Sequence, residues 1–440
     1  MEVYHIFRGY DVRGIFNKDL TVDVMARIGM AIATYAPANY AVGGDGRGST
    51  PPLKEALIAG LTAAGVDVYD IGTIPIGAAM YSTLHLGYGM AYVTASHLPP
   101  EWNGVKLSRP HGDLMVGPDI YAIRDLYMNP SKLRKADYAS VGRWARLDIL
   151  PEYVSFLRKQ VKSSGLKIVV DCGNGVASLV APLVLRDAGH EVLCLNCDID
   201  PRFPARGSEP SPEAVEELRR TVVEVGADFG VAFDGDGDRT LYVDDKGRIL
   251  TAEQAGIIML KGGERGDVVA NVECSMTIDD YVKSYGGRIF RVPVGRTYIV
   301  REVSKRNAVL GVESSGHYVV RRNTNMDDGL LTLVHFTDCV ASLGEPLSES
   351  VPPSYPILRS KVEVGDEAKF KIVEKIKEKM LAEYDRVETI DGVRVDFDEG
   401  WVLIRPSNTE PVIRVTVEGR TRGIAEKLLR KYVELVKKSK

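Results

Sequence analysis

Three segments of the chain share one pattern of hydrophobic and polar positions: a short apolar run, a turn of small residues, and a helix-like run. They begin as YAVGGDGRGSTPP at 40–52, KIVVDCGNGVAS at 167–178 and DVVANVECSMT at 267–277. After the first, PLKEALIAGLTAAGV predicts an amphipathic helix and DVYDIG predicts a further strand. Parallel strands need crossover connections, so these repeated units predict three related α/β domains with mostly parallel, mixed sheets.

The C-terminal part of the chain has a different pattern. After the proline-rich VPPSYP at 351–356, the run EAKFKIVEKIKEKMLAEY predicts a long amphipathic helix. Short strands are expected around 386–397, 400–405 and 411–418, followed by a final helix in GIAEKLLRKYVELVKK. This order predicts a smaller α+β domain. We therefore place four domains at 1–146, 147–245, 246–355 and 356–440.

Composition narrows the class of protein. A chain of 440 residues is too long to fold around one hydrophobic core. Its composition, 45% apolar and 26% charged residues, is ordinary for a globular protein. Lys+Arg 56 against Asp+Glu 60 gives a net charge of −4, too balanced to attract nucleic acid or anionic lipid. No apolar run approaches the roughly 18 residues of a spanning helix, and the N-terminus lacks a signal-peptide pattern. We expect a cytoplasmic protein with no nucleic-acid or membrane partner.

The cysteines number five, an odd and sparse set that fits reduced thiols better than a disulfide framework. Cys194 and Cys197 form a C-x-x-C pair, but EVLCLNCD predicts a strand, in which residues three apart point to opposite faces. We expect buried thiols rather than a metal site.

The densest chemical signal is DFGVAFDGDGDRTLYVD at 228–244, a strand that enters an acidic loop and a second strand that leaves it. Asp234, Asp236 and Asp238 alternate with glycines, which let the backbone curl so that three carboxylates converge on a hard cation such as Mg²⁺ or Ca²⁺. An EF-hand is disfavoured, because Arg239 and Asp245 occupy the positions of its turn glycine and bidentate Glu. A solvated Asp-Gly turn is the simpler alternative, but the clustered acids favour a catalytic Mg²⁺ site.

A second signal is YVTASHLPPEWNGVKL at 92–107, where a strand enters a polar loop with Ser96 next to His97 and with Lys106 further on. A serine hydroxyl needs activation by a base or a metal to be a nucleophile. The chain has no G-x-S-x-G sequence, which argues against a hydrolase serine. An isolated Ser-His pair is commonplace, so its meaning depends on the other signals.

A third signal is WVLIRPSNTEPVIRVTVEG at 401–419, a strand, a polar turn and another strand. Hydroxyls, backbone N–H groups and a guanidinium in one turn form a cradle for phosphate, although an ordinary Asx or Ser turn has the same composition. The candidate phosphate ligands are Arg405, Ser407, Asn408 and Thr409.

A fourth signal is GVESSGHYVV at 311–320, in which Glu313, Ser315 and His317 alternate. In an extended chain these side chains share one face, which suits the binding of sugar hydroxyls or, equally, the wet face of an edge strand. No Walker A sequence is present, and GNGVAS at 173–178 has Ser178 where a dinucleotide fingerprint needs its third glycine. A nucleotide cofactor is not indicated.

The ordered set of motifs resembles one family, the α-D-phosphohexomutases, in particular the phosphomannomutase/phosphoglucomutase branch. The resemblance covers essentially the whole chain and rests on FRGYDVRGIF, VGGDGRGSTPP, TASHLPPEWNGVK, VVDCGNG, DGDGDR, ESSGH, DDGLL and RPSNTEP. It implies four domains around a central cleft, three related α/β units and a smaller α+β unit. It also implies interconversion of hexose 1-phosphate and hexose 6-phosphate, with mannose or glucose as the sugar.

The resemblance further implies a role for each candidate residue. Ser96 would carry a phosphoryl group, and Mg²⁺ would be bound by Asp234, Asp236, Asp238 and a phosphoserine oxygen. Lys106 and Arg239 would stabilise charge on the transferring group, with His97 handling a proton and a hexose 1,6-bisphosphate acting as activator. The small sugar phosphate that is the partner would be bound by Tyr10, Arg13, Glu313, Ser315, His317, Arg405, Ser407, Asn408 and Thr409.

Two departures from the family pattern affect the expected site. Leu98 stands where Asn is usual, beside the expected phosphoserine. Pro293 stands where relatives often have a Lys proposed to transfer a proton, and Arg296 where Asp is frequent. The identity of the general base is therefore open.

Three other functions compete with this interpretation. Phosphoglucosamine mutase uses the same chemistry on an amino sugar, and only the loop TASHLPPEWNG favours the phosphomannomutase/phosphoglucomutase branch over it. A Mg²⁺-dependent sugar phosphohydrolase would need the same acids and serine. A sugar-phosphate-binding protein would need the Arg405 turn but not a serine beside a metal site.

Overall fold

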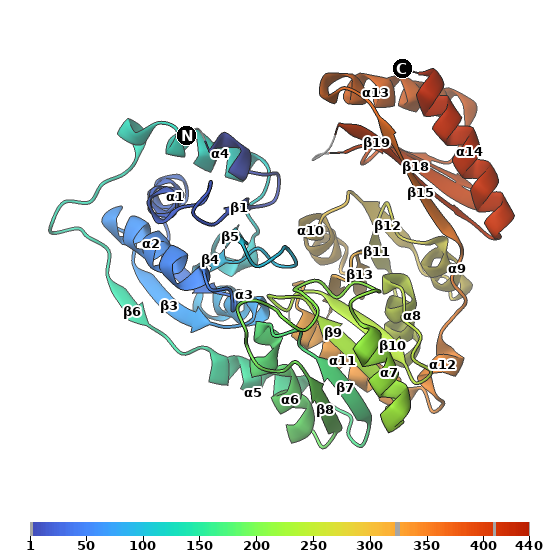
Figure 1. Ribbon diagram of the computed structural model, residues 1–440, viewed down its shortest axis with the longest axis horizontal. Helices are drawn as coiled ribbons and strands as arrows, with labels where there is room; N and C mark the ends of the chain where they lie inside the picture. The colour runs from blue at the N-terminus through green and yellow to red at the C-terminus, as the bar shows by residue number, and fades with distance from the viewer. Residues whose placement is uncertain (1–2, 322–325, 408–410, 440) are drawn as a thin grey trace. The chain divides into compact units, whose positions relative to one another are not determined.

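A computed structural model describes residues 3–321, 326–407 and 411–439, with the side chains of 366 and 367 not included. Figure 1 shows the helices and strands of the chain, coloured from the N-terminus to the C-terminus. The chain divides into two compact units. The first comprises Met1–Leu250 and Met326–Glu349, and the second comprises Thr251–Asn325 and Ser350–Lys440. None of the helices within the described residues has the length and apolar character needed to cross a bilayer.

The first unit begins with a six-stranded sheet of order β1-β5-β4-β2-β3-β6. Strands β2, β3, β4 and β6 are parallel, whereas β5 runs antiparallel to both β4 and β1. The strands are β1 Val12–Ile15, β2 Tyr40–Gly44, β3 Val68–Thr73, β4 Gly89–Val93, β5 Trp102–Ser108 and β6 Trp144–Arg146. The helices are α1 Val22–Tyr35, α2 Thr50–Ala63, α3 Ile76–Leu86 and α4 Pro118–Tyr127, with 3-10 turns at Tyr4–Ile6, Pro110–Gly112 and Pro130–Lys132.

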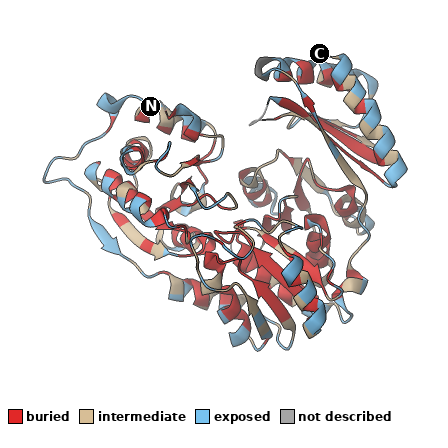
Figure 2. Ribbon diagram, in the orientation of Figure 1, coloured by how far each residue is buried: buried red, intermediate tan, exposed pale blue. Residues whose placement is uncertain are grey.

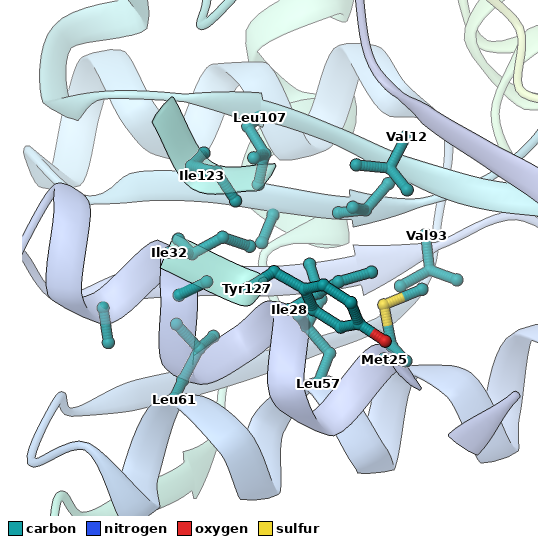
Figure 3. Packing of buried hydrophobic residues seen from close by; sticks show 14 of the residues in the cluster. Val12, Met25, Ile28, Ile32, Leu57, Leu61, Val93, Leu107, Ile123 and Tyr127 are labelled. Atoms are coloured by element: carbon teal, nitrogen blue, oxygen red, sulfur yellow. The ribbon is translucent and has the colours of Figure 1, made fainter. Parts of the chain in front are cut away.

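Helices α1, α2 and α4 pack with this sheet around one buried core (Figure 3). Met25, Ile28 and Ile32 lie three and four positions apart on α1, so they share one helix face. Burying a side chain of this size stabilises the fold by roughly 1.5–3 kcal/mol. Helices α1 and α2 approach closely at Gly60, where a Cβ atom would lie 1.9 Å from the Ala26 carbonyl oxygen. This contact therefore requires glycine.

A second, four-stranded sheet completes the first unit, with order β10-β9-β7-β8 and only β10 antiparallel. Its strands are β7 Lys167–Asp171, β8 Glu191–Leu195, β9 Phe229–Phe233 and β10 Thr240–Asp244. Its helices are α5 Leu150–Gln160, α6 Ala181–Asp187, α7 Glu216–Val225 and α11 Gly329–Ser342, with a 3-10 turn at Val176–Leu179.

Helix α11 belongs to this unit although it begins 85 residues after the end of β10 in the chain. Phe336 of α11 stacks on Tyr242 of β10 with ring centroids 3.8 Å apart. Asp328 caps the helix by accepting from the N–H groups of Leu330 and Leu331, and Tyr153 of α5 donates to the same carboxylate at 2.7 Å. A segment from the C-terminal half of the sequence therefore packs into the domain that contains β7–β10.

The second unit contains the other two sheets. The third sheet, of order β12-β11-β13-β14 with β14 antiparallel, has β11 Val268–Asn271, β12 Ile289–Val292, β13 Leu310–Val312 and β14 Tyr318–Val320. The fourth sheet is antiparallel, with β15 Ile357–Glu363, β16 Val387–Glu388, β17 Val393–Phe397, β18 Gly400–Pro406 and β19 Val412–Gly419. The helices of this unit are α8 Ala252–Gly262, α9 Met276–Ser284, α10 Arg296–Arg306, α13 Asp366–Glu383 and α14 Arg422–Lys438. Helix α12, Leu347–Ser350, spans the point where the chain passes from the first unit into the second.

Buried polar contacts join the third and fourth sheets. Glu418 on β19 accepts from the Met276 N–H at 2.7 Å, from Trp401 Nε1 at 2.5 Å and from the Ser275 hydroxyl. Arg394 lies over the Trp401 ring and donates to carbonyl oxygens of the loop before α9. The carboxylate thus caps the start of α9 from another sheet.

The predicted fold class is confirmed: three mixed α/β sheets precede a smaller C-terminal α+β domain, and the sheet strands are largely buried while outer helix faces are exposed (Figure 2). The domain boundaries stay a prediction. One local expectation is wrong, because residues 313–317 are not extended but form the turn between β13 and β14. The Glu313 N–H donates to the His317 carbonyl at 2.9 Å, and Gly316 has φ +90°.

A second local expectation is also wrong. Strand β8 ends at Leu195, and Asn196 turns the chain with φ +52°, so Cys197 lies beyond the strand. Cys194 and Cys197 are both half-buried, and of the expected buried thiols in this region only Cys172 is buried.

Candidate active site

Ser96 lies in the loop that joins β4 to β5. Its backbone has φ +53°, which a non-glycine residue seldom adopts, and its N–H donates to Thr94 Oγ1 at 2.8 Å. Its side chain is buried. Because such a backbone conformation costs free energy, the surrounding contacts must impose it.

Arg47, in the loop after β2, supplies those contacts. Its guanidinium is fully buried, and Nε donates to Asp45 Oδ2 at 2.9 Å. The other donors reach carbonyl oxygens at 2.6–3.2 Å, those of Ser96, Leu98, Pro99 and Trp102. All five N–H groups of the side chain are therefore used, and four of them hold the Ser96 loop.

The three candidate metal ligands lie in the hairpin turn between β9 and β10, as predicted, and all are buried. Asp234 Oδ1 accepts from three successive backbone N–H groups at 3.1–3.2 Å, those of Gly237, Asp238 and Arg239. Gly235 passes next to the Ser96 loop, where a Cβ atom would lie 2.9 Å from the Ser96 carbonyl oxygen. The missing side chain lets the two loops meet.

Serine, lysine and carboxylates converge where these loops meet. Ser96 Oγ donates to Asp234 Oδ2 at 2.8 Å. Lys106 on β5 is buried, with Nζ 2.8 Å from Asp236 Oδ2 and 2.7 Å from Asp238 Oδ2. The structure therefore brings together five of the residues singled out in the sequence, from segments more than a hundred positions apart.

The cluster has the charge and the donors for a divalent cation. Burial, reinforced by the neighbouring charges of Asp236 and Asp238, raises the pKa of Asp234 well above its usual range. One oxygen from each of the three carboxylates lies within 4.8 Å of the others. Asp236 Oδ1 is buried and has no hydrogen-bond partner among the described residues. A buried carboxylate oxygen that has no hydrogen-bond partner is a suitable ligand for Mg²⁺.

His97 and Arg13 lie near this cluster. Burial, together with the nearby cations Arg239, Arg13 and Lys106, lowers the pKa of His97 to about 2, so its imidazole is neutral at pH 7. Arg13 is fixed to the Ser96 loop by donating to the Ala95 carbonyl at 3.0 Å. Tyr10 is 41% exposed.

The second unit carries the remaining candidates. Glu313 and His317 are buried in the β13–β14 turn and Ser315 is exposed, while Glu313 accepts from the Gly295 N–H at 2.9 Å. Arg405, at the end of β18, pairs with Glu273 at 3.0 Å and with Asp391 at 3.2 Å. Ser407 is buried in the turn that follows. Asn408 and Thr409 lie outside the described residues.

The sequence reasoning missed three residues of the first site. Thr94 lies 3.1 Å from Asp236 and bonds Asp45 at 2.7 Å, so it links two acidic groups behind Ser96. Asp45 and Arg47 stand in GDGRG directly after a predicted strand. The sequence signal that could have found them is a pair of oppositely charged residues between glycines, directly after a predicted strand. In a parallel sheet, the loops at the carboxyl ends of the strands lie at the same edge and form the ligand site.

Comparison with known proteins identifies the class. Models of the phosphoglucomutase/phosphomannomutase domains match in order: α/β/α domain I at residues 5–134, domain II at 151–247, domain III at 249–356 and the C-terminal domain at 360–435. A crystal structure of a phosphoglucomutase/phosphomannomutase family protein from Burkholderia thailandensis has a TM-score of 0.90 at 28% identity, covering 100% of this chain and 98% of that one.

Curated relatives agree along almost the whole chain. A probable phosphoglucosamine mutase of Methanopyrus kandleri is 35% identical, covering 97% of this chain and 96% of the relative. The phosphoglucomutase/phosphomannomutase of Thermococcus kodakarensis is 33% identical, covering 98% and 97%. The chain therefore belongs to the phosphoglucomutase/phosphomannomutase family within the α-D-phosphohexomutases, whose members are phosphosugar mutases.

Proposed function

We propose that this protein interconverts the 1-phosphate and 6-phosphate of a hexose through a phosphoserine at Ser96. The observation that carries the proposal is the 2.8 Å hydrogen bond between Ser96 Oγ and Asp234 Oδ2 in a buried cluster of three carboxylates. This hydrogen bond supports a role for Ser96 Oγ as a phosphoryl acceptor beside a proposed cation site, an arrangement that a binding protein would not need.

The proposed reaction transfers phosphoryl groups without water. The P–O bond to Ser96 breaks as O6 of hexose 1-phosphate attacks, which gives a hexose 1,6-bisphosphate. The sugar turns, Ser96 Oγ then takes the phosphoryl group from O1, and hexose 6-phosphate leaves. The same bisphosphate, added from outside, would act as activator by phosphorylating Ser96.

The residues of the first unit have distinct roles in this proposal. Mg²⁺ bound by Asp234, Asp236, Asp238 and a phosphoserine oxygen would neutralise charge on the transferring group. Lys106 and Arg239 add fixed positive charge at the same place. Nδ1 of His97 has no hydrogen-bond partner among the described residues, and His97 is our candidate for handling the proton of the attacking hydroxyl.

Substrate contacts are assigned to both units. The candidates of the first unit are Arg13, which contacts the Ser96 loop, and Tyr10. Glu313, Ser315 and His317 are proposed to bind sugar hydroxyls. Arg405 is proposed to bind the phosphate that does not react, together with the turn residues Ser407, Asn408 and Thr409. A guanidinium suits this task because it binds phosphate in bidentate fashion.

Two kinds of sugar phosphate are candidates: that of a neutral hexose and that of an amino sugar. The loop TASHLPPEWNG supports glucose or mannose phosphate. Glucosamine phosphate is the second candidate, favoured by similarity to the probable phosphoglucosamine mutase of M. kandleri. The three sugars differ only at C2, in the configuration or the identity of the substituent, and a site that contacts other hydroxyls accepts several of them.

The test is ³¹P NMR of the protein with Mg²⁺ and catalytic glucose 1,6-bisphosphate, given mannose, glucose or glucosamine 1-phosphate in parallel. We expect a 6-phosphate signal to replace the 1-phosphate signal, with relative rates that identify the sugar. Ser96→Ala should abolish conversion and still bind sugar phosphate, while Ser284→Ala, at the exposed end of α9, serves as the matched control. Release of inorganic phosphate would indicate a phosphohydrolase, and binding without conversion in the unaltered protein would indicate a binding protein.

A further inference from the structure

Two cysteines meet behind the acidic hairpin, in the second sheet of the first unit. Cys172 directly follows β7, and Cys197 lies just beyond β8. Their Sγ atoms are 3.0 Å apart, about 1 Å more than the roughly 2.05 Å of a disulfide bond. The left-handed turn at Asn196 brings the second thiol back toward the first.

The backbones of the two loops are already fixed to each other. The Cys172 N–H donates to the Leu195 carbonyl at 3.1 Å, and the Asn174 N–H donates to the Asn196 carbonyl at 2.9 Å. Asn196 Nδ2 also donates to Asp171 at 3.2 Å. Because the two strands are adjacent and their ends are bonded, the sulfurs can join without moving either strand.

The thiols differ in a way that suits stepwise exchange. Cys172 is fully buried, and burial raises the pKa of its thiol well above the usual range. Cys197 is half-buried, and the hydrogen bond with Cys172 lowers the pKa of its thiol. A thiolate at the more accessible position is the one that attacks an incoming disulfide.

We propose that Cys172 and Cys197 are a redox-sensitive pair that forms a disulfide by exchange with a small-molecule disulfide such as oxidised glutathione. Cys197 attacks the reagent and releases one thiol. Cys172 then loses its proton and attacks Cys197 Sγ, which releases the second thiol. Two protein thiols and one external disulfide thus give one protein disulfide and two external thiols.

The link would fix the loop that supports the candidate metal site. The Val176 N–H donates to the Gly235 carbonyl at 3.4 Å, and a Cβ atom on Gly175 would lie 3.0 Å from the same oxygen. Arg206 bonds both Asp171, at 2.6 Å, and the Phe233 carbonyl, at 2.7 Å. Constraining residues 172–197 therefore constrains the backbone beneath Asp234.

The test is peptide mapping of the full-length protein after equilibration with oxidised glutathione, alkylation of free thiols and trypsin digestion. Cleavage after Lys167, Arg186 and Arg202 separates the two cysteines into peptides 168–186 and 187–202. We expect these peptides joined, with Cys194 alkylated, and a melting temperature raised by about 5 °C that reverses with dithiothreitol. Cys194→Ser and the distant Cys339→Ser should keep the link, and Cys197→Ser should lose it.

Three results would overturn the proposal. The first is a disulfide within peptide 187–202, which would join Cys194 to Cys197. The second is a glutathione adduct without a disulfide between protein cysteines, and the third is persistence of free thiols at Cys172 and Cys197. Because the readout is peptide mass, it does not depend on mutase activity. Failure of the proposed function and failure of the disulfide proposal are therefore separate outcomes.

Discussion

Asp328 offers a quantitative test of how the first unit is stabilised, through the variant Asp328→Asn. Its carboxylate caps α11 and accepts from Tyr153, yet it is buried, and burial raises its pKa from 3.8 to about 6. Asn is also a good N-cap and remains uncharged at every pH. The substitution therefore removes the titration while keeping most of the cap.

The magnitude follows from the pKa. A carboxyl group whose pKa is raised by folding binds its proton more tightly in the folded state, so stability falls as pH rises between the unfolded and folded values. A shift from 3.8 to about 6 corresponds to about 3 kcal/mol at pH 7. We expect the stability of the natural protein, relative to Asp328→Asn, to fall by about that amount between pH 4 and pH 7.

Differential scanning calorimetry at several pH values checks this expectation. The difference in melting temperature between the two proteins should change by about 5–10 °C across the range, in favour of Asp328→Asn at higher pH. Asp125→Asn, an exposed carboxylate on α4, is the control and should give a flat difference. A flat difference for Asp328→Asn as well would refute the raised pKa.

Three further predictions concern the Ser96 loop, the candidate metal site, and the contact between the third and fourth sheets. Arg47→Lys should lower kcat by about 100-fold with little change in KM, because fewer donors hold the Ser96 loop; steady-state kinetics that show unchanged kcat would contradict this. Mg²⁺ should raise the melting temperature of the natural protein and not that of Asp236→Asn, and equal shifts would argue against the metal site. Glu418→Gln should lower the melting temperature by about 2–6 °C, because one buried hydrogen-bond acceptor is lost, while Glu426→Gln, at an exposed position, should not. An unchanged melting temperature in Glu418→Gln would show that Glu418 does not stabilise the contact between the two sheets.

Local patterns were the reliable guide to the fold and to the acidic loop. The alternation of Asp and Gly in DGDGD between two apolar runs specifies a hairpin turn through contacts within a few residues, so sequence reasoning could find it. The helix-strand order of the four sheets is local in the same sense, since each element follows from its own hydrophobic period.

Long-range pairing could not be predicted in this way. Arg47 acts on carbonyl groups about fifty positions away, and nothing in GDGRG says which loop it will reach. The polar alternation of ESSGH fits an extended strand as well as a turn, and the turn forms because β13 and β14 pair and Gly316 accepts a positive φ. The meeting of Cys172 and Cys197 likewise depends on the pairing of β7 with β8.

The position of α11 has a consequence for synthesis on the ribosome. At about 5–20 residues per second, Phe336 emerges roughly 5–20 s after Tyr242, the ring on which it stacks. During that interval the β9–β10 face lacks its cover, while the first part of the second unit is being made. A nascent chain or fragment that ends near Leu250 therefore exposes apolar surface of the kind that chaperones bind. The acidic hairpin contacts Gly329 only after α11 has been synthesised and has packed against the second sheet.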